Sequence, residues 1–149
     1  MIQLRSDINR IEDSDLRIDM MQQTDELLDR SQHLPTGDRV LLEQVMRYGF
    51  TAMEISRLSG CSPSTVLRKV KKLQSRLCDP MFRFVTEKEI LIPRGLKVTA
   101  RLIFVDGLSM SKTAEKQKIS MHEVRKRVAK IRMLVEAHKQ VSSAGKRLC

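Results

Sequence analysis

Five polar side chains share one face of a helix predicted to begin near Pro63. They are Ser64, Thr65, Arg68, Lys69 and Lys72. They face outward if Val66 and Val70 face inward, because residues three and four apart share a helix face. Short hydroxyls suit base edges or phosphates, and an arginine can donate two hydrogen bonds to guanine. Ser62 and the first-turn amides would meet a phosphate at the positive end of the helix dipole. The pattern therefore predicts nucleic-acid recognition.

A second helix, starting near residue 120, carries a related and more basic outward set. Its members are Ser120, His122, Glu123, Lys126, Arg127 and Lys130. Phosphate binding is predicted here, whereas base reading stays open. Glu123 could accept a hydrogen bond from cytosine or pair with Arg127 four residues later. We interpret His122 as a polar surface contact rather than a metal ligand or a catalytic base.

The sequence lacks the residue patterns that enzymes, metal sites and cofactor sites require. It has no carboxylate cluster, Cys/His pair or glycine-rich phosphate loop. Cys61, Cys78 and Cys149 are widely spaced, which favours buried or free thiols over zinc or a disulfide framework. We expect no catalytic residues, no metal and no cofactor.

The net charge of +10 is distributed unevenly along the 149 residues. Residues 1–37 hold four Arg and eight Asp/Glu, a net of −4, so the remainder carries 24 basic and 10 acidic residues, a net of +14. This favours a polyanionic partner, nucleic acid ahead of an anionic membrane, although basic faces that only maintain solubility are an alternative. No apolar run approaches the roughly 20 residues of a membrane span, and the N-terminus lacks signal-peptide order. A cytoplasmic, nucleoid-associated protein is expected.

These side chains must be positioned by a helix, a turn and a second helix. We predict a helix from an Asp38 N-cap to Gly49, a short helix over 52–58, a turn at 59–61, and a helix capped by Ser62 that runs to about residue 77. Ser56 supplies the small residue where the helices cross, Gly60 tolerates positive φ, and Cys61 is expected to be the buried turn residue.

The residues after Asp79-Pro80 predict a β-hairpin. Residues 81–85 are interpreted as one strand and 90–92 as the returning strand, which together would form a wing. An irregular linker that covers the core is the alternative. Farther along, we predict helices over 93–105, 109–116 and 120–137, and a disordered tail over 138–149. Residues 1–33 predict an acidic helical arm.

An internal repeat with an offset of 58 residues links the two basic helices. Residues 34–77 placed over 92–135 give eight identities in 44 positions. The identities fall on Pro and Gly residues that interrupt helices, on helix caps and on positions expected to face inward. We therefore interpret two copies of one three-helix unit, with chance alignment of capped helices as the alternative. In the second copy Ala114 holds the small-residue position and Ile119 the turn position, while Lys118 replaces the turn glycine.

The stretch LPTGDRVLLEQVMRYGFTAMEISRLSGCSPSTVLRKVKKLQSRL resembles DNA-binding region 4 of sigma-70-type factors and the LuxR-type helix-turn-helix. The resemblance implies a recognition helix in the major groove that reads through Ser64, Thr65, Arg68 and Lys69; Ser56 replaces the family's usual alanine. LCDPMFRFV followed by ILIPRGLKV is similar to the wing and next helix of LysR-type regulators. With 37 residues before the first unit, a complete sigma factor is not expected, and the chain is too short for the LysR effector domain.

The expected fold is mainly α, with two tandem three-helix helix-turn-helix units, the first followed by a hairpin wing. The expected domains are an arm over 1–33, a first unit over 34–92, a second over 93–137 and a tail over 138–149. The expected function is sequence-specific transcriptional regulation through double-stranded DNA. RNA polymerase and a second copy, joined through the arm, are further candidate partners. The alternatives are a DNA-end-binding module of a transposase or phage packaging machine, and a polymerase-docking, sigma-like adaptor.

Overall fold

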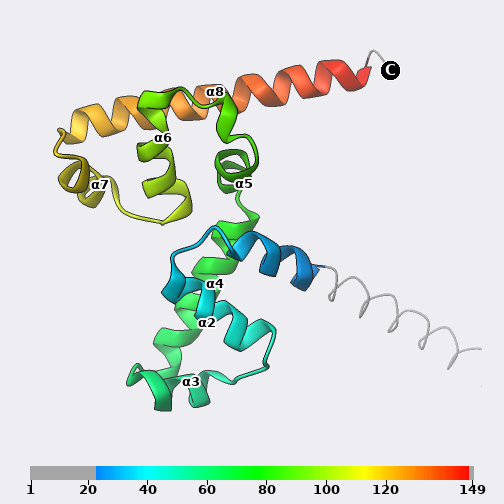
Figure 1. The fold of residues 1–149 in the computed structure, drawn as a ribbon, viewed down its shortest axis with the longest axis vertical. Coiled ribbons are helices and arrows are strands. Elements are labelled where there is room, and N and C mark those ends of the chain that lie inside the picture. Colours follow the sequence, from blue (N-terminus) through cyan, green and yellow to red (C-terminus); the bar gives the residue numbers. More distant parts are fainter. Residues whose placement is uncertain (1–22, 148–149) are drawn as a thin grey trace, which may run out of the picture. The chain divides into compact units, whose positions relative to one another are not determined.

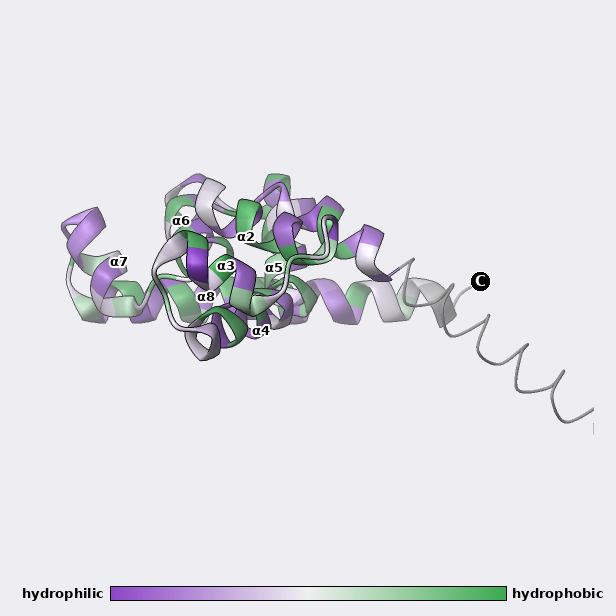
Figure 2. Cartoon of the chain, turned by 90° about the horizontal axis from the view of Figure 1, so that it is seen from below, coloured by the Kyte–Doolittle hydropathy of each residue, from purple (hydrophilic) through white to green (hydrophobic). Residues whose placement is uncertain are grey.

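The computed structural model describes the chain from residue 23 to residue 147, and these residues are mainly helical (Figure 1). Residues 23–31 form a helix. The elements that follow are α2 (Thr36–Met46), α3 (Ala52–Ser59), α4 (Pro63–Cys78), α5 (Pro80–Glu87), the 3₁₀ helix η1 (Glu89–Leu91), α6 (Arg94–Ala100), the π-helix η2 (Arg101–Val105), α7 (Met110–Gln117) and α8 (Met121–Arg147). Hydrophobic and hydrophilic residues interleave along the helices (Figure 2), as in amphipathic helices that bury one face.

The described chain divides into two compact units. Unit 1 contains residues 23–32 and 36–71, and unit 2 contains residues 33–35 and 72–147. The chain therefore enters unit 2 briefly at 33–35, returns to unit 1, and leaves it again within α4. The predicted arm lies mostly on residues before 23, outside the described residues, and its described end is helical.

Local capping signals set the helices of unit 1. Thr51 and Glu54 form a capping box at the start of α3, with the Thr51 amide donating to the Glu54 carboxylate at 2.7 Å. Gly60 ends α3 in the left-handed conformation, at φ 73°. The Ser62 hydroxyl caps α4 by accepting from the Thr65 amide at 3.3 Å. The predicted N-cap at Asp38 is wrong: α2 begins at Thr36, so Asp38 lies inside its first turn.

The predicted wing is also wrong, because no strand occurs in the described part of the chain and residues 80–87 form α5. Asp79 both follows α4 and caps α5, its carboxylate accepting from the Met81 amide at 2.8 Å, and Pro80 takes the first helical position. Phe82, Phe84 and Val85 are all buried, with Phe82 and Val85 on one helical face and Phe84 on another. Their near-alternation resembled a strand because a short helix and a short strand cannot be distinguished by period.

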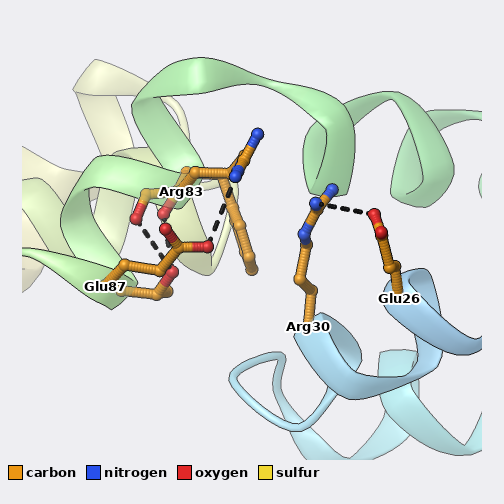
Figure 3. Close-up of polar contacts among 6 residues, drawn as sticks. Glu26, Arg30, Arg83 and Glu87 are labelled. Atoms are coloured by element: carbon orange, nitrogen blue, oxygen red, sulfur yellow. Dashed lines mark hydrogen bonds and ion pairs between the residues drawn. The ribbon is translucent and has the colours of Figure 1, made fainter. Parts of the chain in front are cut away.

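Ion pairs one turn apart support two of these helices. Arg83 and Glu87 are 3.5 Å apart on α5, and Arg30 and Glu26 are 3.2 Å apart on the helix at 23–31 (Figure 3). Such exposed pairs contribute only about 0.3–0.5 kcal/mol each to a helix. Burial of the apolar faces therefore dominates the stability of α5.

Arg76 of α4 lies against Gly107, two residues after the π-helix η2 ends. The Arg76 guanidinium donates to the carbonyl oxygens of Val105 and Asp106, both at 3.4 Å. Gly107 adopts φ 71°, and a Cβ placed there would lie 2.1 Å from Arg76 Nη2. Glycine is therefore required at this position both by the backbone conformation and by the close approach of Arg76.

Elements η2, α7 and α8 pack together around the buried residues Ala114, Val124 and Val128, and α6 packs against α8. The Thr99 hydroxyl of α6 donates to the Gln117 side chain of α7 at 2.8 Å. Helix α8 continues to Arg147, so the expectation of a disordered tail is wrong over 138–147. Phe84 of α5 packs on His138 with ring centroids 5.4 Å apart, which gives the start of that tail a tertiary contact.

The 58-residue repeat reappears in the backbone. The starts of α3 and α4, shifted by 58 residues, coincide with those of α7 and α8, and the end of α3 coincides with that of α7. Gly49 and Gly107 both have positive φ, as do Gly60 and Lys118. The buried residues Val66, Val70, Leu73 and Leu77 correspond to Val124, Val128, Ile131 and Val135, which are also buried. The equivalent positions thus include those that set the turns and the buried faces of α4 and α8, whereas the identical pairs Val40/Val98 and Lys72/Lys130 are exposed.

Candidate nucleic-acid interface

One face of α4 presents the five polar residues singled out from the sequence. Val66 and Val70 lie on the inward face of the helix and are only 5% and 7% exposed, so this face is buried in the core. The polar set is exposed to solvent: Ser64, Thr65, Arg68, Lys69 and Lys72. The assignment of the inward and outward faces is therefore confirmed, and the binding role of the outward face stays a prediction.

The hydroxyl groups at the start of α4 form a local network. Ser62 Oγ lies 2.7 Å from Thr65 Oγ1 and 3.3 Å from Ser64 Oγ. Ser62 also caps the helix, so its oxygen is partly committed to the backbone. Ser64 has the weaker of the two hydroxyl contacts and is exposed, which leaves it the freer of the three to bind a ligand.

The two cations in the middle of the face differ in their partners. Lys69 Nζ pairs with Asp38 Oδ1 of α2 at 3.2 Å, although the Lys69 side chain remains 56% exposed. Arg68 is exposed and forms no ion pair within the described chain. Of these two cations, Arg68 is therefore the one that can meet an external anion or base without first losing a protein partner.

The turn between α3 and α4 follows the expected backbone, with one correction. Ser56 is half-buried at the helix crossing and donates its hydroxyl to the carbonyl of Cys61. Cys61 was expected to be the buried turn residue, but it is exposed. It lies at the edge of a cavity of about 230 Å³ that Val40, Leu41 and Ile55 also line. The small side chain leaves this space open instead of filling it.

The second outward set lies on α8, again above two buried valines. Ser120 Oγ caps the helix by accepting from the Glu123 amide at 3.1 Å. The exposed members are Ser120, His122, Lys126 and Lys130. Lys126 and Lys130 form no ion pair within the described residues, so both are available to an anion.

Glu123 and Arg127 are engaged with each other. Arg127 Nε donates to Glu123 Oε1 at 3.1 Å, and both side chains are only partly exposed. This hydrogen bond from Arg127 holds the pKa of Glu123 below its ordinary value, with further lowering from the charges of Arg127, Lys126 and Lys130. Of the two roles left open for Glu123, pairing with Arg127 is the one seen in the structure.

The turn before α8 keeps the backbone of its counterpart with different side chains. Lys118 adopts the left-handed conformation at φ 55°, where the first turn uses Gly60. Ala114 is buried at the small-residue position, and Ile119 packs against it while half-buried. These equivalent positions were predictable from the repeat. The Asp38–Lys69 pair was not predicted, because its partners lie 31 positions apart and no local pattern indicates the contact. The Thr51–Glu54 capping box was missed too, although its T-x-x-E spacing was readable.

Across residues 23–147, no group of three or more His, Cys, Asp or Glu side chains is arranged to hold a metal ion. None of the helices described has the length and apolar character needed to cross a membrane. No protein-family model matches the chain, and neither the curated proteins nor the solved structures compared with it include a match.

Proposed function

We propose that the protein binds double-stranded DNA, with α4 as the element that enters the major groove. The observation that carries the proposal is the outward face of α4, where Arg68 is exposed and free of ion pairs above the buried Val66 and Val70. The preceding helix, the left-handed turn at Gly60 and the capped start of α4 form the order of elements that helix-turn-helix proteins use.

The second unit is proposed as a tandem helix-turn-helix that adds affinity more than specificity. Arg127 is tied to Glu123, which removes the side chain best suited to bidentate guanine recognition. Lys126 and Lys130 remain available as point charges for phosphates. Electrostatics then supplies much of the affinity, since residues 38–149 carry a net charge of +14.

A regulator of transcription is the biological role we propose for such a protein, acting by binding rather than catalysis. A polymerase-docking adaptor is the second candidate, and the exposed apolar side chains of unit 1 favour it. Leu58 and Met53 of α3 are 74% and 55% exposed, and Leu67 of α4 is 52% exposed. Apolar side chains so exposed on adjoining elements suit protein contact better than contact with a phosphate backbone. A DNA-end-binding module of a transposase or packaging machine would share the α4 chemistry and differ in the sites selected.

The proposal is tested by selecting bound sequences from a random duplex pool and measuring affinity by fluorescence anisotropy at several salt concentrations. Arg68→Ala should lose about 1–3 kcal/mol on the selected site and relax the preference at one base position. Lys71→Ala, on the same helix and also exposed, is the matched control. It should weaken all sequences alike and lower the salt slope by no more than about one.

Equal effects of the two substitutions on all sequences would overturn α4 as the reading element. Failure to enrich any sequence, together with retention of RNA polymerase in a pull-down that survives Arg68→Ala, would replace DNA binding with the adaptor role. A Leu58→Ser variant then provides the converse control, since it should abolish polymerase retention only if that role is correct.

A further inference from the structure

Unit 2 contains a cavity that no step of the proposed DNA binding uses. Its volume is about 190 Å³, and its apolar wall includes Val85, Ile92 and Val105, all of them buried. Lys97 and Arg101 line it from α6 and η2, and His33 lines it from the short segment that enters unit 2. The cavity thus combines an apolar floor with a basic rim.

The two cations of the rim are one helical turn apart and share no carboxylate partner. Lys97 is half-buried and Arg101 is exposed, and neither forms an ion pair within the described chain. The nearest acidic lining residue, Glu89, does not pair with either. Like charges four residues apart destabilise a helix by a few tenths of a kcal/mol. An anion bound between Lys97 and Arg101 would attract both and offset their mutual repulsion.

At the equivalent positions of the repeat, unit 1 pairs a cation with a carboxylate. Shifted by 58 residues, Lys97 corresponds to Arg39 and Arg101 to Glu43. Arg39 and Glu43 form an ion pair 4.0 Å apart on α2. Unit 2 therefore keeps the first cation and replaces its carboxylate partner with a second cation, so the carboxylate that pairs with the cation in unit 1 has no counterpart at this position.

The backbone that carries Arg101 is the π-helix η2. The Asp106 amide donates to the Arg101 carbonyl at 2.9 Å, and the whole of Arg101–Val105 has π-helical geometry. π-Helical turns are rare and occur frequently at functional sites. The equivalent position of unit 1 has the same kind of bond, from the Tyr48 amide to the Glu43 carbonyl at 3.1 Å, but α2 ends at Met46 and no π-helix is formed there. The π-helical turn is thus more extended in the unit that has the cavity.

We propose that this cavity binds a small aliphatic carboxylate. The carboxylate group would lie between Lys97 and Arg101 and accept charge-assisted hydrogen bonds from both. The hydrocarbon body would then lie against Val85, Ile92 and Val105. At about 30 Å³ per water-sized group, the space holds roughly six non-hydrogen groups. A nucleic-acid phosphate fits less well, because it has no apolar part to place against the buried wall.

The probes are 3-methylbutanoate, L-valine, 3-methylbutan-1-ol and inorganic phosphate, titrated into the full chain by isothermal calorimetry and by amide shifts in NMR spectra. We expect at least one of the two carboxylates to bind and to shift the amides around residues 97–105. The alcohol, which has the same body without the charge, should bind at least tenfold more weakly. Binding of L-valine in preference to 3-methylbutanoate would specify an amino acid, with Glu89 facing its ammonium group; the reverse order would specify a simple acid.

Arg101→Gln and Lys97→Gln should each weaken carboxylate binding tenfold or more. Arg94→Gln is the matched control, since it removes one exposed positive charge from the same helix without lining the cavity. Val98→Phe changes an exposed lining residue and should block binding by filling the space without altering charge. Circular dichroism and thermal unfolding establish that each variant is folded.

Absence of binding by both carboxylates to the folded chain would overturn the proposal, as would equal binding of the alcohol. Phosphate binding as strong as that of the carboxylates would reduce the site to a general anion site and likewise overturn it. Loss of binding in Arg94→Gln equal to that in Arg101→Gln would do the same. The result is independent of DNA binding, which is measured separately through Arg68.

Discussion

Replacing Gly107 with alanine should destabilise unit 2 by more than the backbone conformation alone explains. At φ 71°, an L side chain costs about 1 kcal/mol relative to glycine. The new Cβ would also lie 2.1 Å from Arg76 Nη2, so the guanidinium must move away from the carbonyl oxygens of Val105 and Asp106. Loss of these charge-assisted but long hydrogen bonds adds about 1–2 kcal/mol. The expected total is about 2–3 kcal/mol.

Gly49→Ala is the matched control, because Gly49 occupies the equivalent position of the repeat. Its φ is 69°, but nothing lies within 4 Å of the Cβ that alanine would add. Only the conformational cost of about 1 kcal/mol should appear. Urea unfolding followed by circular dichroism gives the total for each variant. Emission from Tyr48, the only tyrosine in a chain without tryptophan, follows unit 1 by itself.

A double-mutant cycle with Arg76→Ala isolates the steric part. In the Arg76→Ala background, Gly107→Ala should cost no more than Gly49→Ala, which makes the coupling about 1–2 kcal/mol. With a urea slope of about 1–3 kcal/mol per molar, this difference moves the midpoint by about 0.3–2 M. Equal losses for Gly49→Ala and Gly107→Ala, or a coupling near zero, would refute the role given to Arg76.

Three further predictions follow from the same structure. Hydrogen bonds from Thr51, first the one from its backbone and then the one from its side chain, hold the pKa of Glu54 below its ordinary value of 4.5. The ionised carboxylate therefore stabilises α3 above pH 4.5. This contribution disappears as the pH falls through the lowered pKa. The stability difference between the protein and Glu54→Gln, measured by thermal unfolding from pH 7 to 3, should therefore be constant above pH 4.5 and shrink below it; a difference independent of pH throughout contradicts this. Ile119 occupies the position of the repeat that is equivalent to Cys61. Cys61→Ile should therefore place a larger apolar side chain in part of the 230 Å³ cavity and raise the unfolding midpoint of unit 1 by an amount corresponding to about 1 kcal/mol. An unchanged midpoint shows that the new side chain stays in solvent. Reversing the charges of Lys126, Arg127 and Lys130 should lower the salt slope of DNA binding by about two to three, and an unaltered slope removes α8 from the interface.

The helix boundaries were largely predictable because their signals are local. Ser62 and Pro63 fix the start of α4, and Ser120 fixes the start of α8, within a span of two or three residues. The left-handed turn at Lys118 was predictable only through the repeat, since nothing in the lysine itself requires positive φ. Its alignment with Gly60 marks the position, but the lysine was interpreted only as a replacement of the turn glycine, and its positive φ is seen in the structure alone.

The errors arose where tertiary packing decides between two local patterns. Residues 81–85 satisfy a strand period and a short helical face equally, and only the burial of Phe82 and Val85 on one side of α5 resolves them. Cys61 is exposed at the edge of a cavity, and the residues next to it in the sequence do not indicate that this cavity exists. Similarly, α8 extends past Ala137 because helix propensity and the Phe84–His138 contact continue after the apolar repeat weakens.

The two copies agree in scaffold and differ in surface chemistry, and this has a consequence for the proposed DNA site. Thr65 and Lys69 of α4 correspond to Glu123 and Arg127 of α8, where the carboxylate and guanidinium satisfy each other. Ser64 corresponds to His122, so the positions proposed to face bases present different hydrogen-bonding groups. Two identical recognition elements would select two identical half-sites, whereas these should select one specific segment and one segment defined only by its backbone. A selected site with two equally conserved halves, bound by a chain that sizes as a monomer, would contradict the division of roles between α4 and α8. The same site bound by a dimer would be consistent with it, because each half would then be read by one α4.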